Sequence, residues 1–391
     1  MFSSVIMLFF RFNQINTIMK HLLLLTFAML FAFNISAQDT EKKLKLYGDV
    51  RFRVEADRNS NKNMKDEQRA DRDRLRYRAR FGFKYNMTDN FEFGMRIRSG
   101  NPANQQSPHV TLGNGFDSAQ LNIDKAYIKV KSNNGLWAWA GKNSMPFWEQ
   151  NELLWDGDVN PEGISFGGKF KMSETSKLAP VVGYYILANN TLTDTDGNSA
   201  QTFGNHSKLM LAQLKYCNKF GSDKLTLSSG IVNAKMTGEL EEDTDDFSYN
   251  IWATSLQYKM NDLGLTAGVD YFSNLEDYKD KLPEVYQDQK TGYAASLKYS
   301  KNNFGAAFTY ASIQKYAVVD MFAQDDWVRW GNNEMTRSSN FKGFELNFKY
   351  KFTDKFNSTL RFWNVEGLEF HNGGNQLETG TRVRLDFNIK F

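Results

Sequence analysis

The chain has 391 residues, a formal net charge of +3 and 15% aromatic residues, with 28 glycines and only 6 prolines. Its one cysteine, Cys217, excludes an internal disulfide. After residue 37 no apolar run reaches the roughly 20 residues that a spanning helix requires, which excludes a helical membrane protein.

The first predicted element is a secretory signal peptide at residues 1–37, with translation expected to start at Met19. Lys20 precedes about a dozen apolar residues, and small residues then lead to a cleavage site after Ala37. This apolar run is too short to span a bilayer. Gln38 stands where a lipoprotein would need a cysteine.

Cleavage would remove Arg11 and Lys20 and no acidic residue, so the 48 basic and 45 acidic residues would become 46 and 45. A mature chain this close to neutral gives no argument for binding nucleic acid. Any charge selectivity must come from where the charges lie. We expect residues 38–391 to form a single domain.

The most regular pattern is a strict alternation over residues 74–85. Arginine occupies every second position from Arg74 to Arg80, and apolar residues fill the positions between. The side chains of a strand alternate between two faces, so one face is cationic and the other apolar. The same alternation returns over residues 382–391. Both segments predict strands that lie between water and an apolar phase.

Sixteen segments are predicted as strands from this alternation and from flanking turn residues. They are residues 43–56, 74–85, 91–98, 123–131, 136–141, 164–170, 178–188, 208–216, 225–232, 249–258, 265–272, 292–299, 304–311, 341–352, 356–364 and 379–391. Short polar turns alternate with long polar loops along this series, a rhythm typical of outer-membrane barrels; a soluble antiparallel sheet is the alternative for any one strand. We therefore predict an all-β fold, a closed antiparallel transmembrane β-barrel of about 16 strands with long external loops, short periplasmic turns and an aqueous channel.

The cost of placing arginine in lipid predicts which face points inward. Each arginine near the bilayer midplane would cost about 2–4 kcal/mol on the lipid side. The cationic faces of the first three strands should therefore line the channel, and Phe52, Tyr77, Phe81 and Phe93 should contact lipid. The predicted pore-lining residues are Arg51, Arg53, Arg74, Arg76, Arg78, Arg80, Arg96 and Arg98.

Four segments resemble a family of bacterial outer-membrane porins common in the Bacteroidota, more distantly similar to phosphate- and sugar-selective porins. The segments are residues 48–53, 73–80 and 154–163 and the terminal Phe391. The resemblance implies passive diffusion of small polar solutes through a barrel in the outer membrane of a Gram-negative bacterium. It also implies that the outer-membrane assembly machinery reads Phe391.

Residues 142–163 form the third long loop of the prediction. In general porins this loop folds into the channel, so the resemblance implies that Trp155, Asp156, Asp158 and Glu162 form a constriction loop. Its acids would then face the arginines and create a transverse field. The alternative is a surface loop whose acids are merely solvated.

Metal binding has a weak signal. Residues 156–160 carry oxygen ligands at alternating positions, like the start of a calcium loop, but Pro161 and Gly167 stand where that loop requires Gly and Glu. Residues 194–198 fail in the same way. We expect no metal and no cofactor, with calcium on one of these loops as the alternative.

Catalysis has little support. His109, His206 and His371 are scattered over predicted loops and are interpreted as surface residues. An outer-membrane hydrolase stays an alternative because such enzymes pair His with Ser or Asp. Trp327 and Trp330 lie in the longest loop, where they either stack on a sugar or close the loop by an apolar contact.

Other loop and strand-end residues predict surface features. The acidic run at residues 239–246 predicts a solvated external loop. Aromatic residues near strand ends predict anchors at the membrane interfaces. These aromatic residues are Trp137, Trp139, Tyr184, Tyr185, Phe352 and Phe356.

The sequence thus predicts a non-enzymatic porin that passes small polar solutes or ions through an arginine-lined channel, either as a general pore or with a preference for anions. A closed barrel used for adhesion or structure is the other alternative. Expected partners are outer-membrane lipids, the assembly machinery and small polar solutes, and no nucleic acid. A homotrimer is compatible with sixteen strands, although no interface pattern marks one.

Overall fold

The computed structural model describes residues 43–61, 70–187, 207–236, 247–279, 281–327, 338–369 and 377–391. Several predicted features lie outside these residues. They are the signal peptide at 1–37, the segment 194–198, the acidic run 239–246, His206, His371 and Trp330.

The described residues fold almost entirely into β-strands. The strands are β1 (Leu44–Asn61), β2 (Arg72–Asn86), β3 (Phe91–Ser99), β4 (Val110–Thr111), β5 (Leu121–Lys131), β6 (Trp137–Lys142), β7 (Glu162–Gly167), β8 (Phe170–Lys171), β9 (Ser176–Ile186), β10 (Lys208–Phe220), β11 (Asp223–Met236), β12 (Phe247–Met260), β13 (Leu265–Asn274), β14 (Thr291–Lys301), β15 (Phe304–Ile313), β16 (Phe341–Lys351), β17 (Phe356–Gly367) and β18 (Thr379–Lys390). One short helix, α3 (Glu284–Gln287), lies between β13 and β14.

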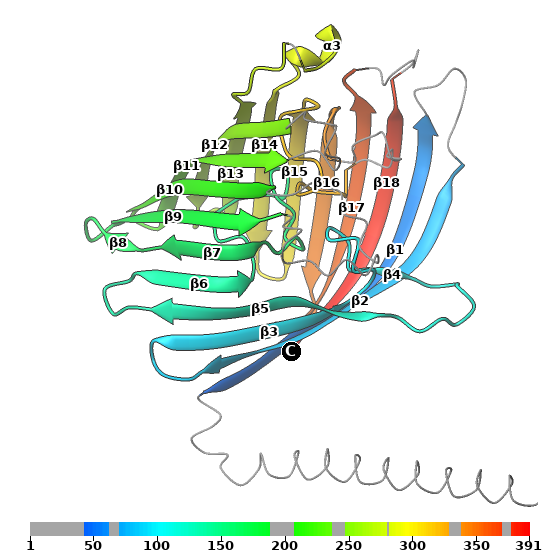
Figure 1. Cartoon of the computed structure of the whole chain (residues 1–391). Coiled ribbons are helices and arrows are strands. Elements are labelled where there is room, and N and C mark those ends of the chain that lie inside the picture. Colours follow the sequence, from blue (N-terminus) through cyan, green and yellow to red (C-terminus); the bar gives the residue numbers. More distant parts are fainter. Residues whose placement is uncertain are drawn as a thin grey trace, which may run out of the picture.

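The strands close into one antiparallel barrel. Neighbours along the chain pair in sequence order, and β1 pairs with β18, from Asp49 opposite Lys390 to Asn61 opposite Thr379, to complete the ring (Figure 1). Two strands, β4 and β8, have only 2 residues each, so 16 strands build the wall. Each of the sixteen predicted segments overlaps one of these strands, and the predicted barrel is confirmed. Closure leaves no unpaired strand edge, as an apolar surrounding requires.

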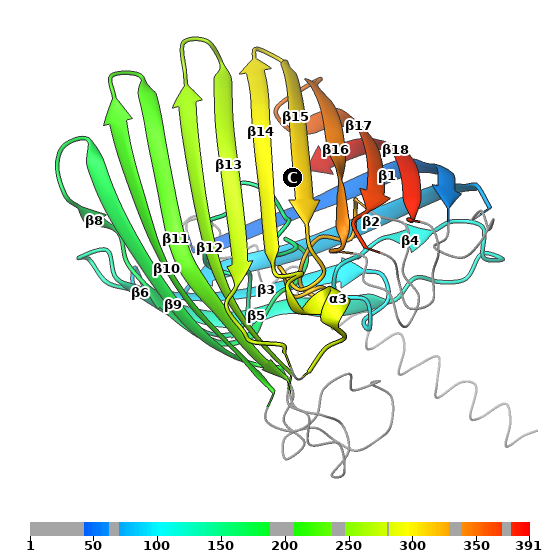
Figure 2. The same ribbon diagram turned by 90° about the horizontal axis from the view of Figure 1, so that it is seen from above.

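The connections differ at the two ends of the barrel. Turns of a few residues join β2 to β3, β10 to β11, β12 to β13, β14 to β15 and β16 to β17 at the end called here the turn end. Longer connections leave the opposite, loop end (Figure 2). Lys43, the first described residue, and Phe391 both lie at the turn end, where Phe391 exchanges backbone hydrogen bonds with Gly48. The long and short connections alternate as predicted.

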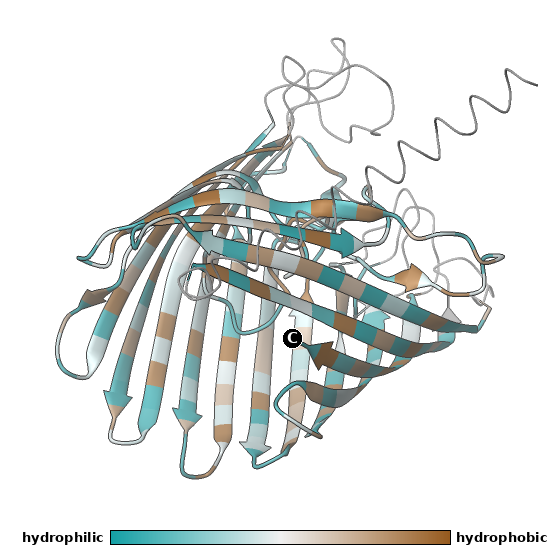
Figure 3. Cartoon of the chain, turned by 90° about the horizontal axis from the view of Figure 1, so that it is seen from below, coloured by the Kyte–Doolittle hydropathy of each residue, from teal (hydrophilic) through white to brown (hydrophobic). Residues whose placement is uncertain are grey.

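Hydrophilic and hydrophobic residues alternate along the strands and appear as teal and brown bands in Figure 3. Phe52 and Leu75 are 53% and 55% exposed on the outside, whereas Arg53 and Arg78 are 4% and 5% exposed on the inside. A period-two pattern therefore gives the barrel an apolar outer face and a charged inner one. Within the described residues, no helix is long and apolar enough to cross a membrane.

The inner wall is not uniformly polar. Toward the loop end, β9, β10 and β12 present buried apolar side chains to the interior, among them Tyr185, Leu209 and Ile251. Trp139 also points inward and packs on Tyr185 with ring centroids 6.0 Å apart. The prediction of these two rings as membrane anchors is wrong, because their strand parity turns them away from the outer face. The interior thus has an apolar sector and a charged sector.

Candidate functional site

The β6–β7 loop, residues 143–161, folds into the barrel. Gly141 and Gly163 face each other across the base of this loop, and both approach the backbone of a neighbouring strand so closely that a Cβ would collide with a carbonyl oxygen, of Ala126 and Tyr184 respectively. Glycine removes that clash and lets the chain turn inward. The loop therefore leaves the wall at a hinge of two small residues.

Residues 314–327, the first described part of the connection that follows β15 and called here the second loop, support the first loop from inside the barrel. The Trp155 ring stacks on Phe322 at 4.9 Å between centroids. Backbone hydrogen bonds join Asp156 N to the Phe322 carbonyl at 2.6 Å and Gln324 N to the Glu152 carbonyl at 3.0 Å. Both loops pack on the apolar sector of the wall, where Leu153 and Trp155 belong to the buried cluster. Burial of each such side chain contributes about 1.5–3 kcal/mol.

The two loops cover the apolar sector of the inner wall. The charged sector, formed by β1, β2, β3, β17 and β18, faces the part of the barrel interior that the loops leave open. The register of β1 and β2 sets Arg51 opposite Arg78 and Arg53 opposite Arg76, so their guanidinium groups share one face. Carboxylates on the same face separate them. Arg53, for example, binds Asp386 through two hydrogen bonds of 2.7 and 3.1 Å. Such bidentate pairs fix the side chains of the wall.

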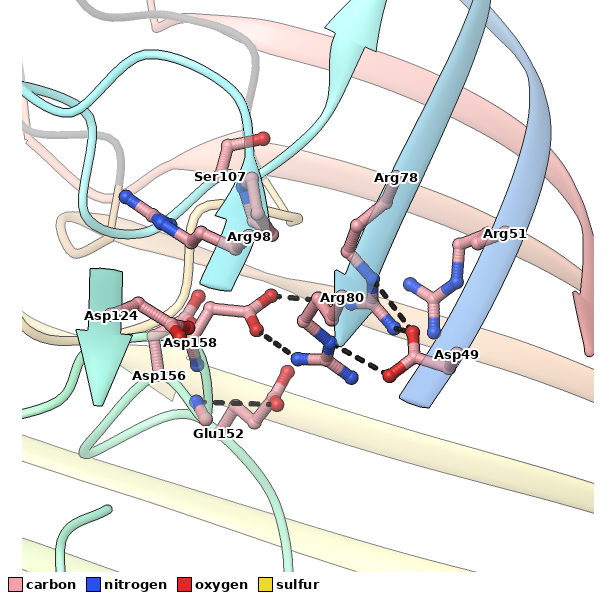
Figure 4. A network of polar contacts seen from close by, with 12 residues as sticks. Asp49, Arg51, Arg78, Arg80, Arg98, Ser107, Asp124, Glu152, Asp156 and Asp158 are labelled. Atoms are coloured by element: carbon pink, nitrogen blue, oxygen red, sulfur yellow. Dashed lines mark hydrogen bonds and ion pairs between the residues drawn. The ribbon is translucent and has the colours of Figure 1, made fainter. Parts of the chain in front are cut away.

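Asp158 crosses from the loop to this wall. Its carboxylate accepts a hydrogen bond of 2.6 Å from Arg80 and one of 3.4 Å from Arg78 (Figure 4). Both arginines also bind Asp49 of β1, at 2.8 and 2.7 Å. Asp156 lies beside Asp158, is buried, and accepts a hydrogen bond from the Asp158 backbone N–H at 2.7 Å. The structure thus brings Asp158 and the arginines together across the channel.

Glu162 does not join this group. It is the first residue of β7 and lies on the outer face with Ile164 and Phe166, both of which are exposed. Its carboxylate pairs with Lys142 Nζ at 2.5 Å, on the neighbouring strand β6. The expectation that Glu162 faces the arginines is therefore corrected, because strand parity points it outward.

The other predicted arginines divide by their partners. Arg74 shares the Glu55 carboxylate with Arg384, and Arg96 pairs with Asp124 at 2.5 Å. Arg51 lies 3.7 Å from an oxygen of Asp386. Arg76 and Arg98 bind only neutral acceptors among the described residues. Arg76 donates to Ser107 Oγ and to the His109 carbonyl, and Arg98 donates to the Asn104 and Gln105 carbonyls. These two guanidinium charges have no carboxylate partner of their own.

Sequence reasoning missed several charged residues that lie between the loops and the wall. Asp326 of the second loop pairs with Arg384 at 2.6 Å and with Arg361 at 3.4 Å. Glu152 of the first loop projects into the channel and is exposed. The alternation of β18 could have placed Arg384 on the wall, since it has the parity of Arg382 and Asp386. No local pattern marks Asp326 or Glu152.

A cavity of about 240 Å³ lies between the loops and the wall. Its charged lining residues are Arg51, Arg53, Arg78, Arg80, Arg361, Glu152, Asp156, Asp158, Asp325 and Asp326. Enclosure by the barrel, followed by the charges of Asp326 and Asp158, raises the pKa of Glu152 to about 7. Burial, together with Glu152 and Asp158, raises the pKa of Asp156 well above its usual value. Near neutral pH, part of the loop charge is therefore neutralised by protons.

His109 lines the same cavity and is half-buried, which corrects its interpretation as a surface residue. Burial and the nearby Arg53 and Arg78 hold its pKa well below the usual value, so the ring is uncharged. Neither ring nitrogen has a hydrogen-bond partner within the described part of the chain. Among the described residues, His109 is the sole histidine, and no group of three His, Cys, Asp or Glu residues is placed to hold a metal.

Trp327 makes an apolar contact in the second loop. It is buried, and its ring lies 5.4 Å from that of Phe341. This geometry agrees with the loop-closing interpretation of the residue rather than with an exposed sugar platform.

Comparisons with known proteins agree with this architecture. The model of the family described as "Putative porin" matches residues 65–231 and confirms the resemblance to porins. OprB of Pseudomonas putida is 12% identical, over 92% of this chain and 97% of that chain, with a TM-score of 0.57. OmpF of Salmonella typhi, solved in complex with daunomycin, is 11% identical, over 89% of this chain and 97% of that chain, with a TM-score of 0.52. At these identities the two structures show a shared fold alone, and no curated protein matches the chain.

Proposed function

We propose that the protein is an outer-membrane porin through which small polar solutes and ions diffuse passively, without covalent chemistry. The observation that carries this proposal is the open cavity between the inward-folded loop and the arginine wall, bridged by Asp158, Arg78 and Arg80. A sixteen-stranded barrel leaves an interior wide enough for an aqueous channel. Fixed opposing charges at its narrowest region would orient and filter solutes.

We propose further that the channel prefers anions among simple ions. Among the described residues, Arg76 and Arg98 form no ion pair and donate only to neutral acceptors. The raised pKa of Asp156 favours its neutral form and so weakens the negative charge of the opposing loop. The net charge between the loop and the wall is therefore positive, and a positive charge attracts anions and repels cations.

Conductance of the purified protein in planar bilayers tests the proposed function. A porin gives stepwise current increases as single channels insert, with a reversal potential under a salt gradient that reports anion preference. A barrel that serves as a hydrolase or an adhesin would leave the bilayer closed, and that result would contradict the proposal.

Anion preference should also depend on pH. Because the pKa of Glu152 is about 7, its carboxylate is charged above that pH and neutral below it. We expect reversal potentials to shift toward anion selectivity between about pH 8 and pH 6. The Glu152→Gln variant should show less of this shift, whereas Glu162→Gln, which removes an outward-facing carboxylate, should keep it. An equal shift in both variants would assign the titration to other groups.

The location follows from the same proposal. We propose that residues 1–37 direct export, that the barrel lies in the outer membrane of a Gram-negative bacterium, and that the assembly machinery reads Phe391. This residue is exposed on the outer face, and its ring stacks on Phe81 at 6.4 Å. The N-terminal sequence of the exported protein tests the cleavage, which should leave Gln38 first.

A further inference from the structure

The cavity between the loops and the wall is lined by ionisable residues of both signs. Five arginines and five carboxylate residues line it. Four of the arginines come from β1 and β2, and the carboxylates come from the two inward-folded loops. Figure 4 shows Arg51, Arg78 and Arg80 on one side, together with Asp49, and Glu152, Asp156 and Asp158 on the other. A site for a simple anion would instead gather cations around one point. This separation of charge suits a solute that is itself a dipole.

Several of these charges are already held in ion pairs, either with each other or with a neighbouring wall residue. Arg53 is held by both oxygens of Asp386, and Asp158 is held between Arg78 and Arg80. A passing solute would have to break short, charge-assisted hydrogen bonds to reach these groups. These ion-paired groups hold the loop against the wall, and they are less available to bind a solute.

Two charged groups, one on the wall and one on the first loop, lack a short ion pair. Arg51 Nε donates a hydrogen bond of 2.6 Å to Asn388 Oδ1. Its ion pair with Asp386 is long, with 3.7 Å between Arg51 Nη1 and Asp386 Oδ2. The Glu152 carboxylate accepts one backbone hydrogen bond, from Gly157 at 3.3 Å. Within the described residues, no ion pair is formed by Glu152. A cation and an anion, both open to the channel, thus face the same small cavity.

We propose that this cavity is a subsite for zwitterionic solutes, of which α-amino acids are the simplest, with the carboxylate directed to Arg51 and the ammonium group to Glu152. The inference rests on the proposed diffusion function and names its solute class. A lone anion would meet Glu152, and a lone cation would meet Arg51, whereas a zwitterion gains from both. The cavity, at about 240 Å³, is smaller than the roughly 300–1,000 Å³ of drug-sized ligand pockets, which restricts the solute to a small molecule.

Two isomeric solutes provide a direct test. L-Alanine and lactamide have the same atoms and no net charge, but only alanine carries separated charges. Osmotic swelling of proteoliposomes near pH 8, where Glu152 is ionised, should be faster with alanine, by about threefold at low solute concentration, since contacts of both signs raise its local concentration. Glu152→Gln and Arg51→Gln should each bring the ratio of the two rates close to one.

The design separates the possible failures. Lactamide swelling in each variant shows that the channel is folded and open, and Glu162→Gln serves as the matched control that should keep the wild-type ratio. Equal rates for the two solutes in the wild type, or an unchanged ratio in Glu152→Gln, would overturn the zwitterion subsite while the diffusion channel stands. Absence of swelling with both solutes in the wild type would overturn the diffusion function and the subsite with it.

Discussion

Replacing Asp158 by Asn should shift ion selectivity toward anions by about twofold to seventeenfold. A unit charge about 10 Å from a permeating ion contributes roughly 0.4 kcal/mol in water and roughly 1.7 kcal/mol at an effective dielectric constant of about 20. Asp158 is the acid that binds the wall arginines, so its loss leaves Arg78 and Arg80 with Asp49 alone. The local field should therefore become more positive at the narrowest region.

The opposite change tests the other side of the channel. Replacing Arg74, Arg76 and Arg78 by Gln should move the reversal potential under a salt gradient toward cation selectivity. Both shifts should be larger at low ionic strength, because the Debye length grows from about 10 Å at 0.1 M to about 30 Å at 0.01 M salt. Glu162→Gln changes the same number of charges as Asp158→Asn but on the outer face.

The possible outcomes test the acidic loop and the arginine wall separately. If Asp158→Asn behaves like Glu162→Gln while the arginine variant shifts, the permeating ion does not pass the loop, and only the arginine lining survives. If neither variant shifts the reversal potential, the ion path avoids the charged sector, and the proposed constriction fails.

The strands and their orientation could be predicted from sequence because both depend on a short-range repeat. The alternation from Arg74 to Arg80 specifies a strand, and the cost of arginine in lipid then specifies its inner face. Glu162 marks the limit of this reasoning. Its position beside the loop predicts a loop residue, but it begins β7, and it shares the outward parity of Ile164 and Phe166. A boundary displaced by a few residues was enough to misplace a charge.

The interior of the barrel could not be predicted in the same way. Trp155 and Phe322 lie far apart in the sequence, in two loops that carry no periodic pattern. An acid that faces a channel and one that faces bulk water have the same surroundings in sequence, so Glu152 and Asp326 gave no signal. The buried apolar residues on the inner wall, such as Leu209, have the pattern of ordinary strand residues in the sequence. Only the structure shows that the loops cover them.

The contact between the two loops predicts a large change in conductance. In Phe322→Ala, Trp155 loses its stacked partner, and the cavity left by removing a buried phenylalanine should cost about 3–5 kcal/mol. A loss of this size changes the ratio of packed to released loop by more than about a hundredfold, because each 1.4 kcal/mol is a factor of ten. The barrel wall should survive, since its backbone pairing does not involve this side chain. We therefore expect a higher single-channel conductance with more current noise.

Single-channel recording and protease sensitivity of the loop, both in the purified protein, would check this expectation. Phe308→Ala is the matched control, because Phe308 is exposed on the outer face, 45%, and contacts neither loop cluster. It should leave the conductance near the wild-type value. If Phe322→Ala exposes the loop to protease without raising the conductance, the loop does not narrow the ion path. If it does neither, the Trp155–Phe322 contact does not hold the loop, and the backbone bonds from Asp156 and Gln324 must do so instead.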